Sequence, residues 1–199
     1  ATQDTGADTD VADPADLYIT ELADPNNNSS ARYVEIHNPG TSDVDLVGWT
    51  LIRWTNDSTS PQSPVALTGT VPAGGFYIVC NDKPDFAIAY GVDCDQDIGT
   101  GGAADSNGDD NIGLQFNGAM VDLFGVPGED GSGTAHEFED GRAERACSNT
   151  APAAVWDAAG WDVDNDSGGG AGAQDAPGGF DPGAWSCLGG GGTDTEEGE

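Results

Sequence analysis

Three short runs near the start of the chain alternate large apolar residues with polar or smaller ones. They occupy residues 17–22, 33–37 and 49–54. A period of two is the pattern of half-buried β-strands, whereas amphipathic helices repeat their apolar residues about every 3.6 positions. Turn sequences such as Asn38-Pro39-Gly40 lie between the runs. The sequence therefore predicts an all-β fold, an antiparallel β-sandwich built from short strands.

Two local signals add detail to this prediction. Asn117-Gly118 stands between two apolar runs, which is a strong signal for a two-residue β-hairpin turn. In the segment NDKPDFAIAYG, Asp82 can cap a helix, Pro84 fits its first turn and Gly91 can end it. We therefore expect one short helix between strands.

The charge of the chain is strongly negative. Asp and Glu number 36 against 5 Lys and Arg, so the formal net charge is −31. Such a field repels phosphate backbones and anionic lipid headgroups and attracts cations and basic partners. We expect no nucleic-acid binding and a saline or calcium-containing environment. No apolar run approaches the roughly 18–20 residues that cross a bilayer, so membrane insertion is not expected.

The four cysteines predict two disulfides. No pair of them has the C-x-x-C spacing of a zinc ribbon or a redox motif, and the count suits an oxidising compartment. Of the three connectivities, we favour Cys80 with Cys94 and Cys147 with Cys187. The chain begins at Ala1 and its single methionine is Met120, which predicts an exported protein whose signal peptide has been removed.

The composition changes at both ends of the chain. Residues 1–16 and 189–199 are acidic, rich in small residues and poor in large apolar ones, as solvated linkers are. We expect one domain over residues 17–188, with a Gly-rich insertion at residues 164–183.

An ordered series of motifs resembles the lamin tail domain family. The matching pieces include Ile19-Thr20-Glu21, the run from Tyr33 to Gly40, Gly48-Trp49-Thr50-Leu51 and Val121-Asp122. The resemblance covers about residues 16–189. It implies an immunoglobulin-like β-sandwich and, for bacterial members, an extracellular location, but no single activity. The acidity, the four cysteines and the Gly-rich insertion depart from the family pattern.

Two acidic stretches are candidate calcium sites. Asp105, Asn107 and Asp109 have the alternating spacing of a calcium loop, and Asn111 could add its carbonyl oxygen. The twelfth position of that loop is Phe116 instead of a bidentate Glu, so the alternative is a turn that leads into a strand. The second candidate has the same spacing, and its alternative is an acidic linker; it consists of Asp162, Asp164 and Asp166.

Catalytic signals are sparse. The chain has two histidines, His37 and His136, one lysine, and no motif of a known hydrolase or metalloenzyme. We expect His37 on the surface and no enzymatic activity. Glu35 lies in the middle of a predicted strand, where it either points to solvent or anchors a loop by accepting backbone hydrogen bonds.

The sequence leaves two functions open. The first is a secreted structural or adhesive protein that binds calcium and associates with copies of itself or with another extracellular surface component. Residues 1–16 could then dock on a neighbouring subunit, as an added strand or in a groove, and build a fibre. The alternative is an accessory ligand-binding domain of a larger secreted, hydrolytic protein.

Overall fold

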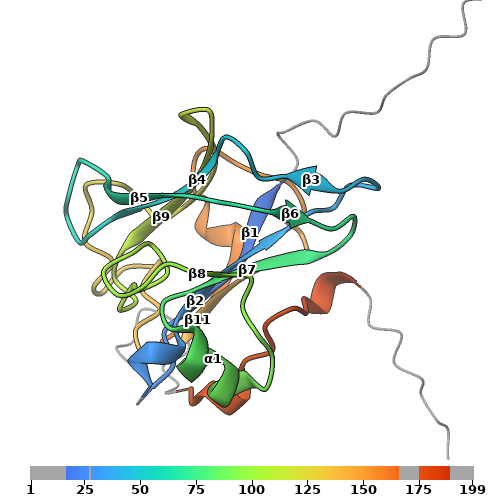
Figure 1. Cartoon of the computed structure of the whole chain (residues 1–199). Coiled ribbons are helices and arrows are strands. Elements are labelled where there is room, and N and C mark those ends of the chain that lie inside the picture. Colours follow the sequence, from blue (N-terminus) through green and yellow to red (C-terminus); the bar gives the residue numbers. More distant parts are fainter. Residues whose placement is uncertain (1–16, 27, 166–174, 189–199) are drawn as a thin grey trace, which may run out of the picture.

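The computed structural model describes residues 17–26, 28–165 and 175–188, and two β-sheets dominate it (Figure 1). The larger sheet has the strand order β12-β11-β1-β2-β7-β8. Its pairs are antiparallel except for the parallel pair of β7 with β8. Its strands are β1 (Tyr18–Ala23), β2 (Tyr33–His37), β7 (Phe76–Cys80), β8 (Gln96–Asp97), β11 (Arg142–Arg145) and β12 (Trp161–Asp164).

The smaller sheet is antiparallel throughout and has the order β10-β9-β4-β5. Figure 1 shows β4, β5 and β9 together in one layer and β1, β2, β7 and β11 in the other. The strands of the smaller sheet are β4 (Trp49–Trp54), β5 (Gln62–Ala66), β9 (Asn111–Phe116) and β10 (Ala119–Phe124). A separate two-stranded ribbon pairs β3 (Val44–Asp45) with β6 (Thr70–Val71).

The described part of the chain has one α-helix, α1 (Lys83–Tyr90). Asp82 caps it by accepting a hydrogen bond from the Asp85 amide, and Gly91 ends it in a left-handed conformation with φ of 74°. This is the helix that the sequence predicts. Short 3-10 turns complete the structure: η1 (Ser29–Ala31), η2 (Ala158–Gly160), η3 (Pro177–Gly179) and η4 (Ser186–Leu188).

The predicted strands and hairpin are also present. β2 and β4 coincide with the second and third alternating runs, and β1 is shifted by one residue from the first. Asn117 and Gly118 join β9 to β10 with φ of 48° and 81°, the left-handed pair of a tight hairpin turn. The all-β sandwich expected from the period of two is confirmed.

Apolar side chains cover both faces of the larger sheet. One face packs against the smaller sheet, and Trp49 and Leu51 are 1% and 0% exposed in that core. The other face lies under α1 and under the segment 175–188, here called the strap, whose Phe180 belongs to the same buried apolar cluster as Phe86 of α1. Because both faces are covered, every residue of β1 and β2 is buried, polar ones included.

Candidate functional site

The side chains of the first calcium candidate are engaged in contacts within the protein. The Asp105 carboxylate accepts hydrogen bonds from Arg32 Nη1 at 3.1 Å, Asn81 Nδ2 at 2.9 Å and the Gly101 amide at 2.7 Å. Burial raises the pKa of Asp105, but these hydrogen bonds outweigh it and leave the pKa below its ordinary value. The Asp105 carboxylate is thus occupied by the protein itself.

The remaining residues of that loop have other partners. Asp109 Oδ2 accepts from Asn56 Nδ2 at 2.9 Å, and Asn107 is exposed. Asn111 accepts from the Val126 amide at 2.7 Å and donates to the Glu129 carbonyl at 3.0 Å. The side chain of Asn111 therefore fastens the loop after β10 to the start of β9.

Two carboxyl oxygens in this region lack a hydrogen-bond partner. They are Asp109 Oδ1 and Asp110 Oδ2, both buried. Asp110 Oδ2 lies 3.3 Å from Arg53 Nη1 in an ion pair, so an arginine occupies part of the space that a cation would need. Burial raises the pKa of both carboxyls, and the charge of Asp110 raises the pKa of Asp109 further.

The second calcium candidate lies on a strand. Asp162 and Asp164 belong to β12, the edge strand of the larger sheet, and Asp166 lies outside the described residues. Extended backbone separates alternate side chains more widely than a calcium loop does. Within residues 17–26, 28–165 and 175–188, no group of three or more His, Cys, Asp or Glu side chains is placed to hold a metal ion.

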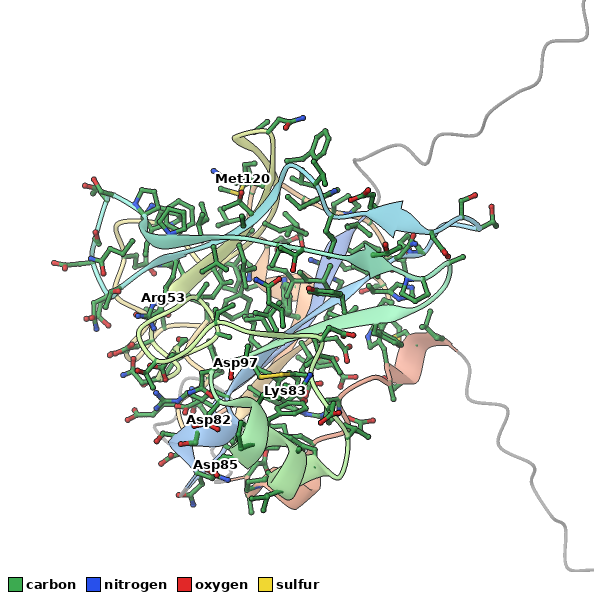
Figure 2. All side chains as sticks on the ribbon, viewed as in Figure 1. Arg53, Asp82, Lys83, Asp85, Asp97 and Met120 are labelled. Carbon is green, nitrogen blue, oxygen red and sulfur yellow. A yellow bond between two sulfur atoms is a disulfide. The ribbon has the colours of Figure 1, made fainter. Side chains whose placement is uncertain are left out.

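All five basic side chains of the protein point into internal contacts. The arginines are at most 27% exposed and each forms an ion pair with a carboxylate. Lys83, labelled beside Asp82 and Asp97 in Figure 2, donates from Nζ to the Cys94 carbonyl at 2.7 Å. The positive charges therefore fasten loops and strands together, and little positive charge reaches the surface to offset the carboxylates there.

The exposed carboxylates are distributed over loops and short strands of the sandwich. Because the basic side chains are engaged inside, these groups form a surface of nearly one sign of charge. In the described residues the exposed members are Asp43, Asp45, Asp57, Asp93, Asp95, Asp97, Glu129, Glu139, Asp157, Asp162 and Asp181.

Glu35 does not point to solvent. It is 0% exposed and accepts hydrogen bonds from Thr20 Oγ1 at 2.7 Å and from the Gly183 amide at 2.6 Å. It thus anchors the strap, which is the second of the two roles that the sequence allowed. The Glu35 carboxyl thus has a hydrogen-bond donor from a segment almost 150 residues later in the chain.

The expectation that His37 lies on the surface is wrong. His37 is 1% exposed, with its ring against those of Tyr18, Phe76 and Trp185. The strap supplies Trp185, and a sequence taken strand by strand carries no signal for that cover. His136 is also buried, and burial lowers the pKa of both histidines, which makes them neutral structural residues.

Asp122 and Arg145 form a buried ion pair between the sheets. Each side chain is 1% exposed, and Asp122 also accepts from the amides of Ile19 and Ala153, both at 2.8 Å. Arg145 lies between two aromatic rings, 5.0 Å from the Tyr18 centroid and 4.6 Å from that of Trp161. The single charge of Asp122 inside an apolar run is a sequence signal for half of this pair, which we did not predict; Arg145 lies next to Glu144 and close to Arg142 and carries no such signal.

Both disulfides have the pairing that the sequence favoured. Cys80 and Cys94 join the end of β7 to the segment after α1, with 6.0 Å between their Cα atoms. Cys147 and Cys187 join the segment after β11 to the strap, with a Cα separation of 5.0 Å. Two disulfides are typical of an oxidising, extracellular environment.

No helix in residues 17–26, 28–165 and 175–188 is long and apolar enough to cross a membrane. The longest one described is α1.

Comparison with known families identifies the first part of the sandwich. The sequence model of the lamin tail domain matches residues 10–128, which is more than half of the chain and includes β1 to β10. No curated protein matches the chain. The match covers the motifs from Ile19 to Asp122 that suggested the family, and the structure has the expected immunoglobulin-like architecture. The chain belongs to the lamin tail domain family.

Proposed function

We propose that the protein is a secreted, non-enzymatic structural or adhesive module whose carboxylate surface associates through calcium with copies of itself or with another extracellular surface component. The observation that carries the proposal is the arrangement of charge. Every basic side chain is engaged in contacts within the fold, while exposed carboxylates lie on loops and short strands.

The family and the burial of both histidines support a module that does not catalyse. Immunoglobulin-like domains of this family are typically non-catalytic, and both histidines are buried in aromatic or apolar surroundings. The two disulfides support an extracellular location, because such bonds persist outside the reducing cytosol.

Calcium in this proposal acts at many exposed carboxylates and not at one coordination site. Two negative surfaces repel each other over about 10 Å at 0.1 M ionic strength. Divalent ions that bind between carboxylates of two molecules remove this repulsion and bridge them. Residues 1–16, which lie outside the described part of the chain, are the proposed docking segment for fibre assembly.

Light scattering and sedimentation velocity of the whole chain test this function. Samples in CaCl2 and in NaCl of equal ionic strength are compared, since general screening is then the same in both. We expect reversible association in CaCl2, dispersal on chelation, and inhibition by a synthetic peptide of residues 1–16. Monomers in CaCl2 at every protein concentration tested would rule the proposal out.

A second function is an accessory ligand-binding domain of a larger secreted, hydrolytic protein. It is favoured by one specific observation, a cavity formed by the segment between β11 and β12. This segment follows the part of the chain that matches the family.

A further inference from the structure

A row of four acidic side chains, here called the carboxyl row, crosses the larger sheet. Glu21 of β1 is paired with Glu35 of β2 on one side and with Glu144 of β11 on the other. Glu144 is paired in turn with Asp162 of β12. Side chains that lie opposite each other in antiparallel strands share a face and are close together, so like charges in these positions repel one another.

The carboxyl row leads from the interior of the protein to its surface. Glu35 and Glu21 are 0% and 2% exposed, Glu144 is partly buried, and Asp162 is exposed. The strap, the red segment that passes beside α1 in Figure 1, covers the buried end of the row. We propose that the strap is closed on the sheet while this buried end holds a proton and opens when the proton is lost.

Hydrogen bonds attach the strap to two members of the row. The Gly183 amide donates to Glu35 Oε2 at 2.6 Å, and Ser186 Oγ donates to Glu144 Oε1 at 3.3 Å. Thr20 Oγ1 donates to the other oxygen of Glu35 at 2.7 Å. Glu35 thus joins the strap to the middle of the sheet through a carboxyl that water does not reach.

Little positive charge faces the row. Arg142 Nη1 lies 3.2 Å from Glu21 Oε1 and 3.1 Å from Asp181 Oδ1 of the strap. Arg142 Nη2 lies 3.4 Å from Glu144 Oε2. No basic side chain of the described residues forms an ion pair with Glu35. Full ionisation would therefore set one arginine against the carboxylates of the row and that of Asp181.

The closed strap favours the protonated form of Glu35. Burial raises the pKa of Glu35, and the charges of Glu21 and Asp181 raise it further. The hydrogen bonds from Thr20 and Gly183 lower this pKa but do not outweigh the other causes. Opening of the strap admits water, which brings the pKa back toward its ordinary value of 4.5. A proton is therefore released on opening, and a rise in pH favours the open strap.

The other titratable side chains around the buried end do not titrate near pH 8. They are Asp24, Tyr33, His37 and Tyr90. Burial raises the pKa of both tyrosines and lowers that of His37, so these three groups are neutral there. Asp24, whose pKa is about 6, lies 2.6 Å from Arg32 in an ion pair. On the β7 side, Ile78 lies opposite Glu35 and adds no charge.

Both ends of the strap are attached independently of Glu35. The Asp175 amide donates to the Asp140 carbonyl at 2.9 Å, and the Asn26 amide donates to the Asp175 carbonyl at 2.8 Å. At the other end, a disulfide joins Cys187 to Cys147. The part between these attachments can therefore leave the sheet and return to the same place. Its opening uncovers a buried apolar cluster. The members of that cluster are Ala23, Tyr33, Ile78, Cys80, Phe86, Cys94 and Phe180.

Hydrogen exchange of the whole chain, followed by NMR between about pH 6 and pH 9, tests the proposal. The opening constant of an amide is its exchange rate divided by the intrinsic rate at the same pH. Glu35 and Glu21, with pKa values of about 8 and about 7, both release protons on opening. The opening constant of the Gly183 amide should therefore rise about tenfold between pH 7 and pH 8.

Two variants identify the group that titrates. Glu35→Gln keeps an acceptor for the Gly183 amide but has no proton to lose. Its opening constant should rise only about twofold over the same pH unit, the contribution of Glu21. Glu129→Gln makes the same change at an exposed carboxyl, so it is the matched control and should show the full rise of the parent.

A second amide separates opening of the strap from unfolding of the sandwich. The Leu67 amide donates to the Trp49 carbonyl at 3.0 Å beside the smaller sheet. Its opening constant should be smaller than that of Gly183 by about tenfold or more at each pH, because the strap opens while the sandwich stays folded.

Three results would overturn the proposal. They are an opening constant at Gly183 that does not rise between pH 7 and pH 8 in the parent, an equal rise in the parent and Glu35→Gln, and equal opening constants at Gly183 and Leu67. The first and the third need no variant, so the proposal can be tested even if Glu35→Gln does not fold. All samples are free of calcium, and the results therefore do not bear on association in CaCl2.

Discussion

Glu21 and Glu35 face each other across the pairing of β1 with β2, and both carboxyls are buried, at 2% and 0% exposure. One arginine, Arg142, lies near the pair, 3.2 Å from Glu21 Oε1. Burial is the main cause that raises the pKa of Glu21 to about 7 and that of Glu35 to about 8. The negative charge of Glu21 raises the pKa of Glu35 further, and the charge of Asp181 raises the pKa of both carboxyls. The pair therefore retains protons under conditions where exposed carboxyls have lost theirs.

The first prediction concerns pH. The pKa of Glu35 in the folded protein, about 8, exceeds the ordinary value of 4.5. The folded state thus binds the proton more tightly, and the free energy of unfolding contributed by Glu35 is complete below about pH 4.5 and is lost as the pH rises to about 8. Glu35→Gln imitates the protonated form, so the variant should lose less stability than the parent between pH 5 and pH 9.

Urea unfolding at several pH values measures this effect. The expected difference in slope between parent and variant is on the order of 1 kcal/mol per pH unit. Glu129→Gln, which removes an exposed carboxyl, is the control for the change in net charge and should follow the parent. Parallel curves for the parent and Glu35→Gln would show that Glu35 does not hold a proton more tightly in the folded state.

The second prediction concerns the buried ion pair. Arg145→Met removes the partner of Asp122 and leaves a carboxylate without its counter-charge between the sheets. We expect a loss of about 3–5 kcal/mol in the free energy of unfolding. Asp122→Asn in the same chain removes the isolated charge and should restore part of that loss. Denaturant unfolding of both single variants and the double variant measures the coupling, and additive effects would contradict it.

The third prediction concerns Gly108, in the loop first considered for calcium. It has φ of 92°, and a Cβ there would lie 2.2 Å from the Glu139 amide nitrogen. Gly108→Ala therefore forces the loop away from residues 138–139 and should cost more than 3 kcal/mol, beyond the roughly 1 kcal/mol of an unfavourable φ alone. Gly118→Ala is the matched control, with φ of 81° and open space around its Cβ. Equal midpoints of unfolding would contradict the close contact.

The fourth prediction concerns the disulfide of the strap. Cys147→Ser with Cys187→Ser opens a loop closed over a sequence separation of 40. The chain-entropy estimate for a loop of this length is about 4 kcal/mol. We expect a loss of this size in urea unfolding, together with faster hydrogen exchange at the Gly183 amide that donates to Glu35. Ser148→Ala, an exposed neighbour, is the control, and unchanged exchange at Gly183 would show that the strap stays in place without the bond.

The strands could be predicted because their sequence signals are local. The alternation in residues 33–37 and 49–54, the Asn117-Gly118 turn and the Asp82 cap each depend on a few neighbouring residues. The surroundings of the charged residues were not predictable in this way. Glu35 meets Gly183, and Asp122 meets Arg145, across separations that a periodic pattern does not encode.

For the same reason, the sequence did not predict the partners of the carboxylates in the first calcium candidate. The spacing of Asp105 and Asp109 is a local feature, but the partners of their carboxylates come from distant strands and loops, among them Arg32 and Asn56. The sequence shows at which positions carboxylate side chains recur. It does not show which hydrogen-bond donors from distant segments contact them.

The position of β11 has a consequence for how this fold could be exchanged between proteins. The family model matches residues 10–128, yet β1, the first strand of that region, has β11 as its neighbour on one side. A fragment ending at residue 128 would leave the main-chain amides and carbonyls of β1 open to pairing with another molecule. The segment that matches the family, residues 10–128, is thus shorter than the segment needed to pair both sides of β1. Gene fusions that contain only residues 10–128 should therefore aggregate.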